Sequence, residues 1–216
     1  MPDFGLLSMP WPRFARLMPT RADSADSDNT TDEALFERTC RGDDHAAFSR
    51  LVTRYRVRVM ALVRRMLTSA QTSIDPEDVA QEAFLDAYRR RATFRRGAQF
   101  RPWLYGIAVN RCVDKIRVKE RESTLTLLPS DDVAESALAA SDDEPIEQLL
   151  RAQEMHDIDQ AIGNLPAKLR AVLVLRYVDD LSYEDIAIAC AMPIGTVKTH
   201  LFRARAELKR RLANED

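Results

Sequence analysis

Glycine is scarce in this sequence, which has only six glycines among 216 residues. Segments in which Val, Ile or Thr alternates with polar residues are also few, whereas a β-sandwich or β-barrel needs many short strands joined by tight turns. Hydrophobic residues at 45% and charged residues at 31% are ordinary for a folded chain. The sequence therefore favours an all-α fold.

Cysteine is rarer still, with three residues, and its placement excludes the common metal sites. Cys40, Cys112 and Cys190 lie far apart, without a CxxC pair or nearby histidines, so no zinc site, other metal or cofactor is expected. The odd count also disfavours a disulfide framework. No run approaches the ~18 apolar residues of a membrane helix, so we expect no membrane insertion and a cytoplasmic protein.

Enzyme motifs are missing as well. The sequence has no nucleophile motif, no phosphate-binding glycine loop and no paired histidine–carboxylate site. We therefore do not expect an enzyme.

The net charge of −2 conceals a segregated charge distribution. Residues 34–122 hold 19 basic and 11 acidic side chains, whereas residues 123–158 hold one basic and nine acidic ones. Residues 196–212 hold six basic side chains and one acidic side chain. Two basic segments separated by an acidic one indicate two segments with affinity for nucleic acid.

Composition and periodicity divide the chain into four parts. Residues 1–33 contain too few regularly spaced apolar side chains to bury, which indicates a disordered N-terminal extension. Residues 34–122 and 145–216 carry helical periodicity and are expected to form two small domains. Residues 123–144 are an acidic, flexible linker that spans about 25 Å as a coil and about 75 Å when extended.

Four helices are predicted in the first domain from apolar residues at i, i+3, i+4 and i+7. Thr30, Asp44 and Asp75 are the expected N-caps of the first three, and Pro76 favours the first turn of the third. The predicted spans are 30–40, with Gly42 ending the first helix, then 44–66, 75–91 and 102–121. In the third helix, four polar residues are expected to face outward: Gln81, Glu82, Asp86 and Arg89.

The second domain ends in a pattern typical of a helix-turn-helix. Ser182 is the expected N-cap of a short helix over 183–190, and residues 191–193 form a joint before a basic helix over 195–212. A further helix is expected over 167–178. Four residues of the basic helix and its joint are expected to pack inward: Ile194, Val197, Leu201 and Ala204. A capped helix, a turn and a basic helix together favour DNA binding over a solvated basic helix.

Three sequence blocks resemble the extracytoplasmic-function (ECF, group IV, RpoE-like) sigma factors of bacterial RNA polymerase, in the sigma-70 family. Residues 78–89 (DVAQEAFLDAYR) resemble region 2.2, and residues 100–110 (FRPWLYGIAVN) resemble regions 2.3 to 2.4. Residues 181–187 (LSYEDIA) and 195–205 (GTVKTHLFRAR) resemble region 4.2. The resemblance covers residues 34–122 and 145–212 and implies a region 2 bundle and a region 4 helix-turn-helix.

The resemblance implies that the chain binds core RNA polymerase and directs it to the minus-35 and minus-10 promoter elements. In the family, region 2.2 docks on the clamp helices of the β′ subunit, and the β flap is a further contact. An anti-sigma factor that masks these surfaces is an implied partner, as is control of a stress or envelope response. Outside such complexes we expect a monomer. The residues implied in polymerase binding are Asp78, Gln81, Glu82, Asp86 and Arg89.

The same resemblance implies two sets of DNA contacts. Near the minus-10 element, Phe94 can stack on an exposed base and Asn110 can donate to and accept from its edge. Six basic residues can hold phosphates there: Arg95, Arg96, Arg101, Arg111, Lys115 and Arg117. The residues implied at the minus-35 element are Thr196, Lys198, Thr199, His200, Phe202, Arg203 and Arg205.

One alternative from the DNA-binding class stays open. Residues 196–201 (TVKTHL) also resemble the output domain of LuxR-type regulators, which act on duplex DNA as stand-alone activators or repressors. Such a regulator would carry a receiver or ligand domain in its N-terminal half. Residues 34–122 lack the parallel-strand pattern of a receiver, so the sigma-factor hypothesis is preferred.

Overall fold

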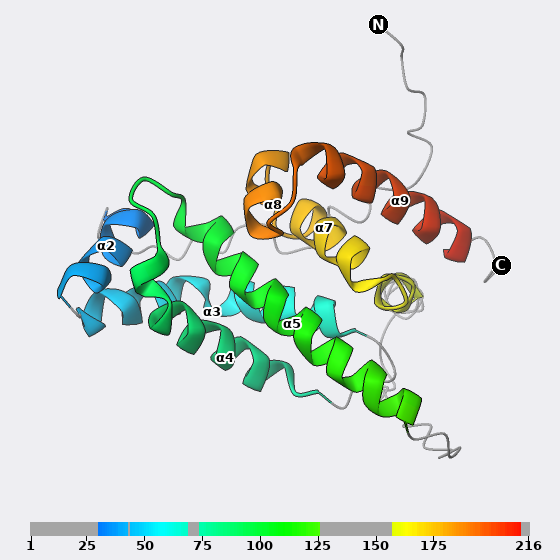
Figure 1. Ribbon diagram of the computed structural model, residues 1–216, viewed down its shortest axis with the longest axis horizontal. Coiled ribbons are helices and arrows are strands. Elements are labelled where there is room, and N and C mark those ends of the chain that lie inside the picture. Colours follow the sequence, from blue (N-terminus) through cyan, green and yellow to red (C-terminus); the bar gives the residue numbers. More distant parts are fainter. Residues whose placement is uncertain (1–29, 43, 69–73, 126–156, 213–216) are drawn as a thin grey trace, which may run out of the picture.

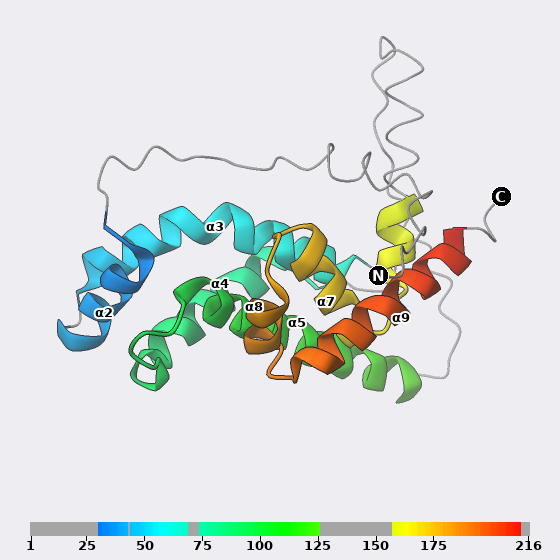
Figure 2. The ribbon, with the colours of Figure 1, turned by 90° about the horizontal axis from the view of Figure 1, so that it is seen from above.

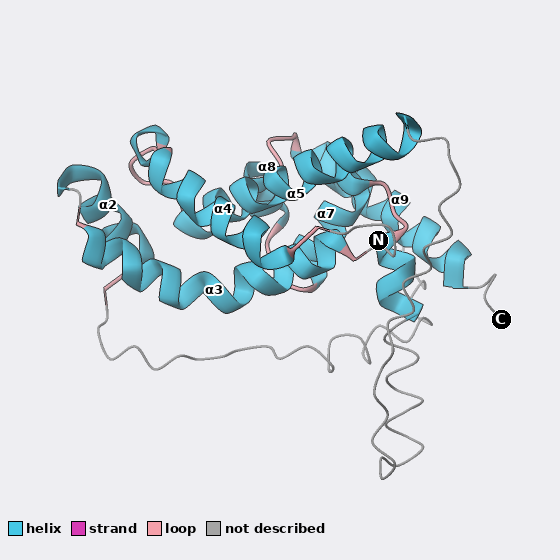
Figure 3. Ribbon diagram, turned by 90° about the horizontal axis from the view of Figure 1, so that it is seen from below, coloured by secondary structure: helices cyan, strands magenta, loops and turns pink. Residues whose placement is uncertain are grey.

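A computed structural model describes residues 30–42, 44–68, 74–125 and 157–212 (Figure 1). Within these ranges the regular structure is helical and contains no strand (Figure 3). The prediction of an all-α fold is confirmed. Most of the predicted N-terminal extension and of the acidic linker lies outside the described residues. None of the helices in the described ranges combines the length and apolar character needed to cross a membrane.

The N-terminal bundle consists of four α-helices and one short 3-10 helix. Their bounds are α2 Asp32–Gly42, α3 His45–Leu67, α4 Pro76–Arg89, η1 Arg91–Thr93 and α5 Phe100–Leu125. Helix α2 therefore begins inside the predicted extension, and α5 runs three residues into the predicted linker.

Local capping chemistry explains where these helices begin. Asp44 Oδ1 accepts a hydrogen bond from Ala47 N at 2.9 Å, and Asp75 Oδ1 accepts one from Glu77 N at 2.8 Å. The prediction that Thr30 caps the first helix is wrong, because the hydroxyl of Thr31 accepts from Ala34 N at 3.2 Å. The helix begins one residue later than predicted, because Asp32 is its first residue and the Asp32 carboxylate accepts a hydrogen bond from Arg54 of α3.

An aromatic cluster joins α2 to the start of α5. Phe36 is fully buried, and its ring centroid lies 4.7 Å from Phe100, 4.9 Å from Phe94 and 5.0 Å from Trp103. Contacts of this kind stabilise aromatic pairs beyond the area that they bury. The cluster therefore fixes the loop between η1 and α5 against the bundle.

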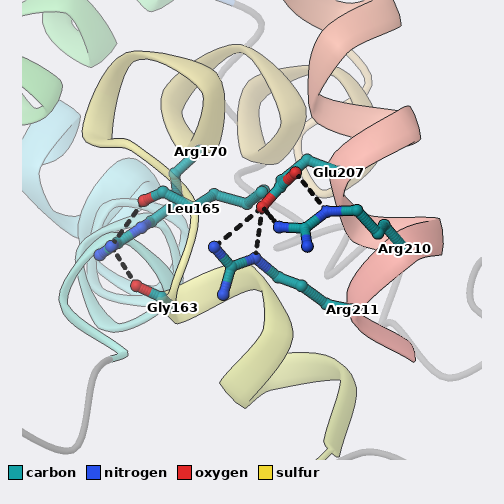
Figure 4. A network of polar contacts seen from close by, with 6 residues as sticks. All are labelled: Gly163, Leu165, Arg170, Glu207, Arg210 and Arg211. Atoms are coloured by element: carbon teal, nitrogen blue, oxygen red, sulfur yellow. Dashed lines mark hydrogen bonds and ion pairs between the residues drawn. The ribbon is translucent and has the colours of Figure 1, made fainter. Parts of the chain in front are cut away.

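The C-terminal group begins with helical residues 157–163 and continues through three helices. These are α7 Ala167–Tyr177, α8 Tyr183–Ala189 and α9 Ile194–Leu212, within a residue of the predicted spans. Ser182 caps α8, since its hydroxyl accepts from Asp185 N at 3.0 Å. At the other end of the group, Glu207 forms ion pairs with Arg210 and Arg211 on α9 (Figure 4).

The two helical groups pack against each other. Helix α8 lies against α5, and α7 lies against α3 and α5, as the view from above shows (Figure 2). Helix α5 is thus covered on one side by α3 and α4 and on another by α7 and α8.

We predict that Phe36→Ala lowers the free energy of unfolding by about 3 to 5 kcal/mol, because it empties the centre of the aromatic cluster. Urea denaturation followed by circular dichroism measures the loss. Val57→Ala is the control, since Val57 is 65% exposed and its truncation should change stability by less than about 0.5 kcal/mol. Equal losses in the two variants would contradict the assigned role of Phe36.

Candidate nucleic-acid interface

The helix-turn-helix is formed by α8 and α9. Residues 190–193 connect them, and Ala191 adopts a left-handed backbone conformation with φ of 49°. The inner side of α9 is apolar: Val197, Leu201, Ala204 and Leu208 are buried. The prediction that Ile194 packs inward is wrong, because Ile194 is the first residue of α9 and its side chain is 39% exposed.

The outer side of α9 presents the residues expected at the minus-35 element. Lys198, Thr199, Phe202, Arg203 and Arg205 are exposed, whereas Thr196 and His200 are half-buried. Phe202 is 70% exposed, which is unusual for a large apolar side chain on a basic helix.

Two contacts within the helix-turn-helix order this surface. The Thr199 hydroxyl donates to the carbonyl of Gly195 at 2.9 Å. The Lys198 ammonium lies 6.0 Å from the centre of the Tyr183 ring, at the limit of a cation–π contact. Thr199 and Lys198, both expected at the minus-35 element, are therefore each in contact with a neighbouring residue of the helix-turn-helix.

A second basic surface lies at the start and along the middle of α5. Arg95 and Arg96 are exposed in the loop before α5, where Gly97 has a φ of 77° that favours glycine. Asn110 and Arg117 are exposed on α5 itself. Phe94 is half-buried against Phe36 and Trp103, so only part of its ring faces solvent.

Two of the expected phosphate-binding residues form ion pairs with carboxylates of α4. Arg111 Nε donates to Asp86 Oδ2 at 2.6 Å, and Lys115 Nζ lies 2.8 Å from Glu82 Oε1. The prediction that Asp86 faces outward is wrong, because its side chain is only 7% exposed. The physical reason is that a buried carboxylate needs an ionic partner, and α5 supplies Arg111.

An apolar groove of about 970 Å³ runs between α3 and α4. Exposed Val57 and Leu85 lie in it together with the half-buried Val52 and Met60. Its polar rim includes Gln81, Glu77, Arg56 and Arg64. The sequence analysis predicted a role for Gln81 but not for Leu85 or Val57. The sequence did contain a signal for both, because each is an apolar residue on the otherwise polar face of its helix.

Three other residues of the expected polymerase-binding set lie on α4 but do not line this groove. Asp78 and Arg89 are exposed on α4, and Glu82 is half-buried beside Lys115. The exposed band of α4 therefore combines polar residues with Leu85 rather than being uniformly charged.

Two of the three cysteines are partly or fully removed from solvent. Burial raises the pKa of the Cys112 thiol to about 12 and that of Cys190 to about 11, which disfavours the reactive thiolate at neutral pH. In the described part of the chain, no cluster of three or more His, Cys, Asp or Glu residues is placed to hold a metal ion.

Comparison with known proteins agrees with this architecture. The family described as "Sigma-70 region 2" matches residues 51–122, and "Sigma-70, region 4" matches residues 155–208. The structure of CnrH bound to the cytosolic domain of CnrY superposes with a TM-score of 0.60 at 23% identity, covering 86% of this chain and 99% of that one. RpoE of Bartonella quintana, solved with the anti-sigma factor NepR, superposes with a TM-score of 0.57 at 23% identity, covering 77% and 96%. These two likenesses show a shared fold.

Closer relatives in sequence show the family. The chain is 38% identical to the RNA polymerase sigma-H factor of Pseudomonas aeruginosa over 184 residues, which cover 84% of this chain and 93% of that protein. It is 39% identical to the ECF RNA polymerase sigma-E factor of Escherichia coli K12 over 187 residues, covering 83% and 93%. The chain therefore belongs to the ECF family of RNA polymerase sigma factors.

Proposed function

We propose that this protein binds core RNA polymerase and directs it to promoters through a minus-35 element and a minus-10 element. The observation that carries the proposal is the outer face of α9, where Lys198, Phe202 and Arg203 are exposed on a helix whose inner face is buried. A helix held in this way enters the major groove with those side chains leading.

At the minus-35 element, Arg203 is the main base reader. A guanidinium can bind O6 and N7 of guanine through two hydrogen bonds, which is worth about 1 to 3 kcal/mol of discrimination. Exposed Phe202 fits an apolar contact with a thymine methyl group. Thr196, Lys198, Thr199, His200 and Arg205 complete the surface as phosphate or base-edge contacts.

At the minus-10 element, Asn110 reads an unstacked base and the exposed arginines of the loop hold the backbone. Arg95, Arg96 and Arg117 are exposed and can bind phosphates. Arg111 and Lys115 would bind DNA while each remains paired with a carboxylate of α4, Asp86 or Glu82. Those pairs fix the spacing of α4 and α5. Phe94, which is half-buried, stacks on the unstacked base with the part of its ring that remains accessible.

Core polymerase binds the groove between α3 and α4. Leu85 and Val57 supply apolar contact area and Gln81 supplies a polar contact in the groove. Asp78 and Arg89, which are exposed elsewhere on α4, extend the contact. An apolar centre with a polar rim is the usual composition of a protein interface. The β′ clamp helices are the proposed partner at this groove, and the β flap is the proposed partner of the second domain.

A protein inhibitor belongs to the same proposal. RpoE of Bartonella quintana was solved with an anti-sigma factor, and CnrH was solved with CnrY. We propose that an anti-sigma factor binds this chain too and that nucleotide polymerisation is carried out by the polymerase alone.

Run-off transcription tests the proposal. Sigma-free core polymerase is supplied with genomic promoter fragments, with and without this protein. New start sites that depend on the protein are the expected result. Tight, specific binding to duplex DNA without polymerase, and no new start sites, would overturn the proposal and favour a stand-alone regulator.

The substitution Arg203→Ala should weaken binding of the reconstituted holoenzyme to a cognate minus-35 sequence by about 1 to 3 kcal/mol. Binding to a scrambled minus-35 sequence should change much less, because only a phosphate contact is lost there. Fluorescence anisotropy with both duplexes measures the difference. Equal losses on the two sequences would remove the base-reading role.

Asn110→Ala should impair promoter opening more than polymerase binding, because Asn110 is exposed on α5 and lies outside the α3–α4 groove. Permanganate reactivity of thymines in the minus-10 region reports opening, and a pull-down of core polymerase reports binding. Wild-type permanganate reactivity in the variant would contradict the assignment.

Leu85→Glu should weaken binding to core polymerase by about tenfold, as expected when a charge enters the centre of an apolar contact. Val118→Glu is the matched control, since Val118 is 52% exposed on α5 and does not line the groove. Titration of core polymerase with labelled protein measures both. Similar dissociation constants for the two variants would exclude the groove.

A further inference from the structure

The first turn of α2 carries two adjacent acids, Asp32 and Glu33, that reach different helices of the bundle. Asp32 Oδ1 lies 2.8 Å from Arg54 Nη1 of α3, and the Tyr55 hydroxyl donates to Asp32 Oδ2 at 2.5 Å. Glu33 Oε1 instead accepts a hydrogen bond at 3.1 Å from the backbone amide of Phe100, the first residue of α5. The start of α2 therefore connects α3 to the beginning of α5.

The Glu33 carboxylate acts as an N-cap that α5 receives from another helix. The first turn of α5 contains no acidic residue of its own, and its third residue, Pro102, has no backbone N–H. The first amides of a helix have no partner within the helix, and a carboxylate is favourable at this positive end. Phe100 is fully buried, so its amide needs an acceptor within the protein. Glu33 supplies that acceptor.

Helix α2 also contacts the other end of the connection between η1 and α5. This connection, residues 94–99, is called the minus-10 loop below. The Phe36 ring of α2 packs edge-on against Phe94 at the start of the loop, with ring centroids 4.9 Å apart. The Cys40 thiol donates to the carbonyl of Arg91 in η1 at 3.2 Å. Helix α2 therefore lies beside the minus-10 loop and holds it at both ends (Figure 1).

We propose that Glu33 is a positioning residue for promoter opening, because its carboxylate fixes the first turn of α5 and, through it, the minus-10 loop. This inference rests on the proposed function, in which Arg95 and Arg96 hold phosphates and Asn110 reads a base. Without the carboxylate, the first turn of α5 has to shift until the Phe100 amide finds another acceptor. The loop arginines would then be displaced relative to Asn110, which lies about three turns further along α5.

The position requires a hydrogen-bond acceptor rather than a negative charge. A carboxylate repels promoter phosphates, so a direct contact between Glu33 and DNA is disfavoured. Glu33→Gln keeps a carbonyl oxygen on a side chain of the same length, whereas Glu33→Ala removes the acceptor. Glu37→Ala is the matched control. Glu37 lies one turn later on α2 and pairs with Arg41 of the same helix at 2.8 Å, so its loss leaves the Glu33 carboxylate in place.

Amide hydrogen exchange of the full chain, followed by NMR, tests the contact without reference to promoters. The Phe100 amide should be protected in the wild type, in Glu33→Gln and in Glu37→Ala. In Glu33→Ala it should exchange at least about tenfold faster, because a hydrogen bond to a charged acceptor changes the local opening equilibrium by about that factor or more. Equal protection of Phe100 in the wild type and in Glu33→Ala would overturn the proposal.

Promoter opening by the reconstituted holoenzyme tests the consequence of the contact. Glu33→Ala should reduce permanganate reactivity in the minus-10 region by about tenfold, the factor expected for the lost hydrogen bond. Its affinity for core polymerase should be that of the wild type, since Glu33 does not line the α3–α4 groove. Glu33→Gln should restore opening, and Glu37→Ala should open the promoter as the wild type does.

The outcomes distinguish this inference from the proposed function. Faster exchange at Phe100 in Glu33→Ala together with normal promoter opening would overturn the positioning role and leave the proposed function in place. Opening that is lost equally in Glu33→Ala and Glu33→Gln would also overturn it, because the second variant retains the acceptor. If the wild type produces no new start sites with core polymerase, the proposed function fails and the promoter role of Glu33 fails with it, whereas exchange at Phe100 still decides whether Glu33 holds α5.

Discussion

Helix α5 packs against α3 and α4 on one side and against α7 and α8 on another. The rest of the structure depends on α5 presenting residues that can be buried on both sides. Its residues Phe100 and Leu104 are fully buried, as are Tyr105 and Cys112. An amphipathic helix has one apolar stripe, whereas a helix with elements on two sides has to present small or apolar residues to both. Gly106 meets that requirement where α8 approaches most closely.

The charged residues of the first domain serve two purposes. Asp86 and Glu82 pair with Arg111 and Lys115, and these pairs connect α4 to α5 rather than extending into solvent. By contrast, Arg95 and Arg96 in the loop before α5 are exposed. The number of basic residues in 34–122 therefore overstates the positive charge that can bind DNA, because some of these residues are already paired with carboxylates of α4.

Much of the architecture was accessible from local sequence. Asp44, Asp75 and Ser182 cap their helices as predicted, because a capping side chain bonds to the backbone two or three residues further on. The buried face of α9 followed from its spacing for Val197 and Leu201. The prediction failed for Ile194, the first residue of α9, because apolar spacing alone does not show whether a residue at a helix end has a neighbour to pack against.

The sequence by itself determined the helices, the caps Asp44, Asp75 and Ser182 and the motifs of the family, because each depends on residues within one or two turns of one another. Only the tertiary structure decided which charges become buried partners and which remain for a ligand. Arg111 meets Asp86 across 25 residues of chain, and Arg101 meets Asp179 across 78. No local pattern encodes such pairings, since they arise from the way separate helices pack and from the cost of burying a charge without a partner.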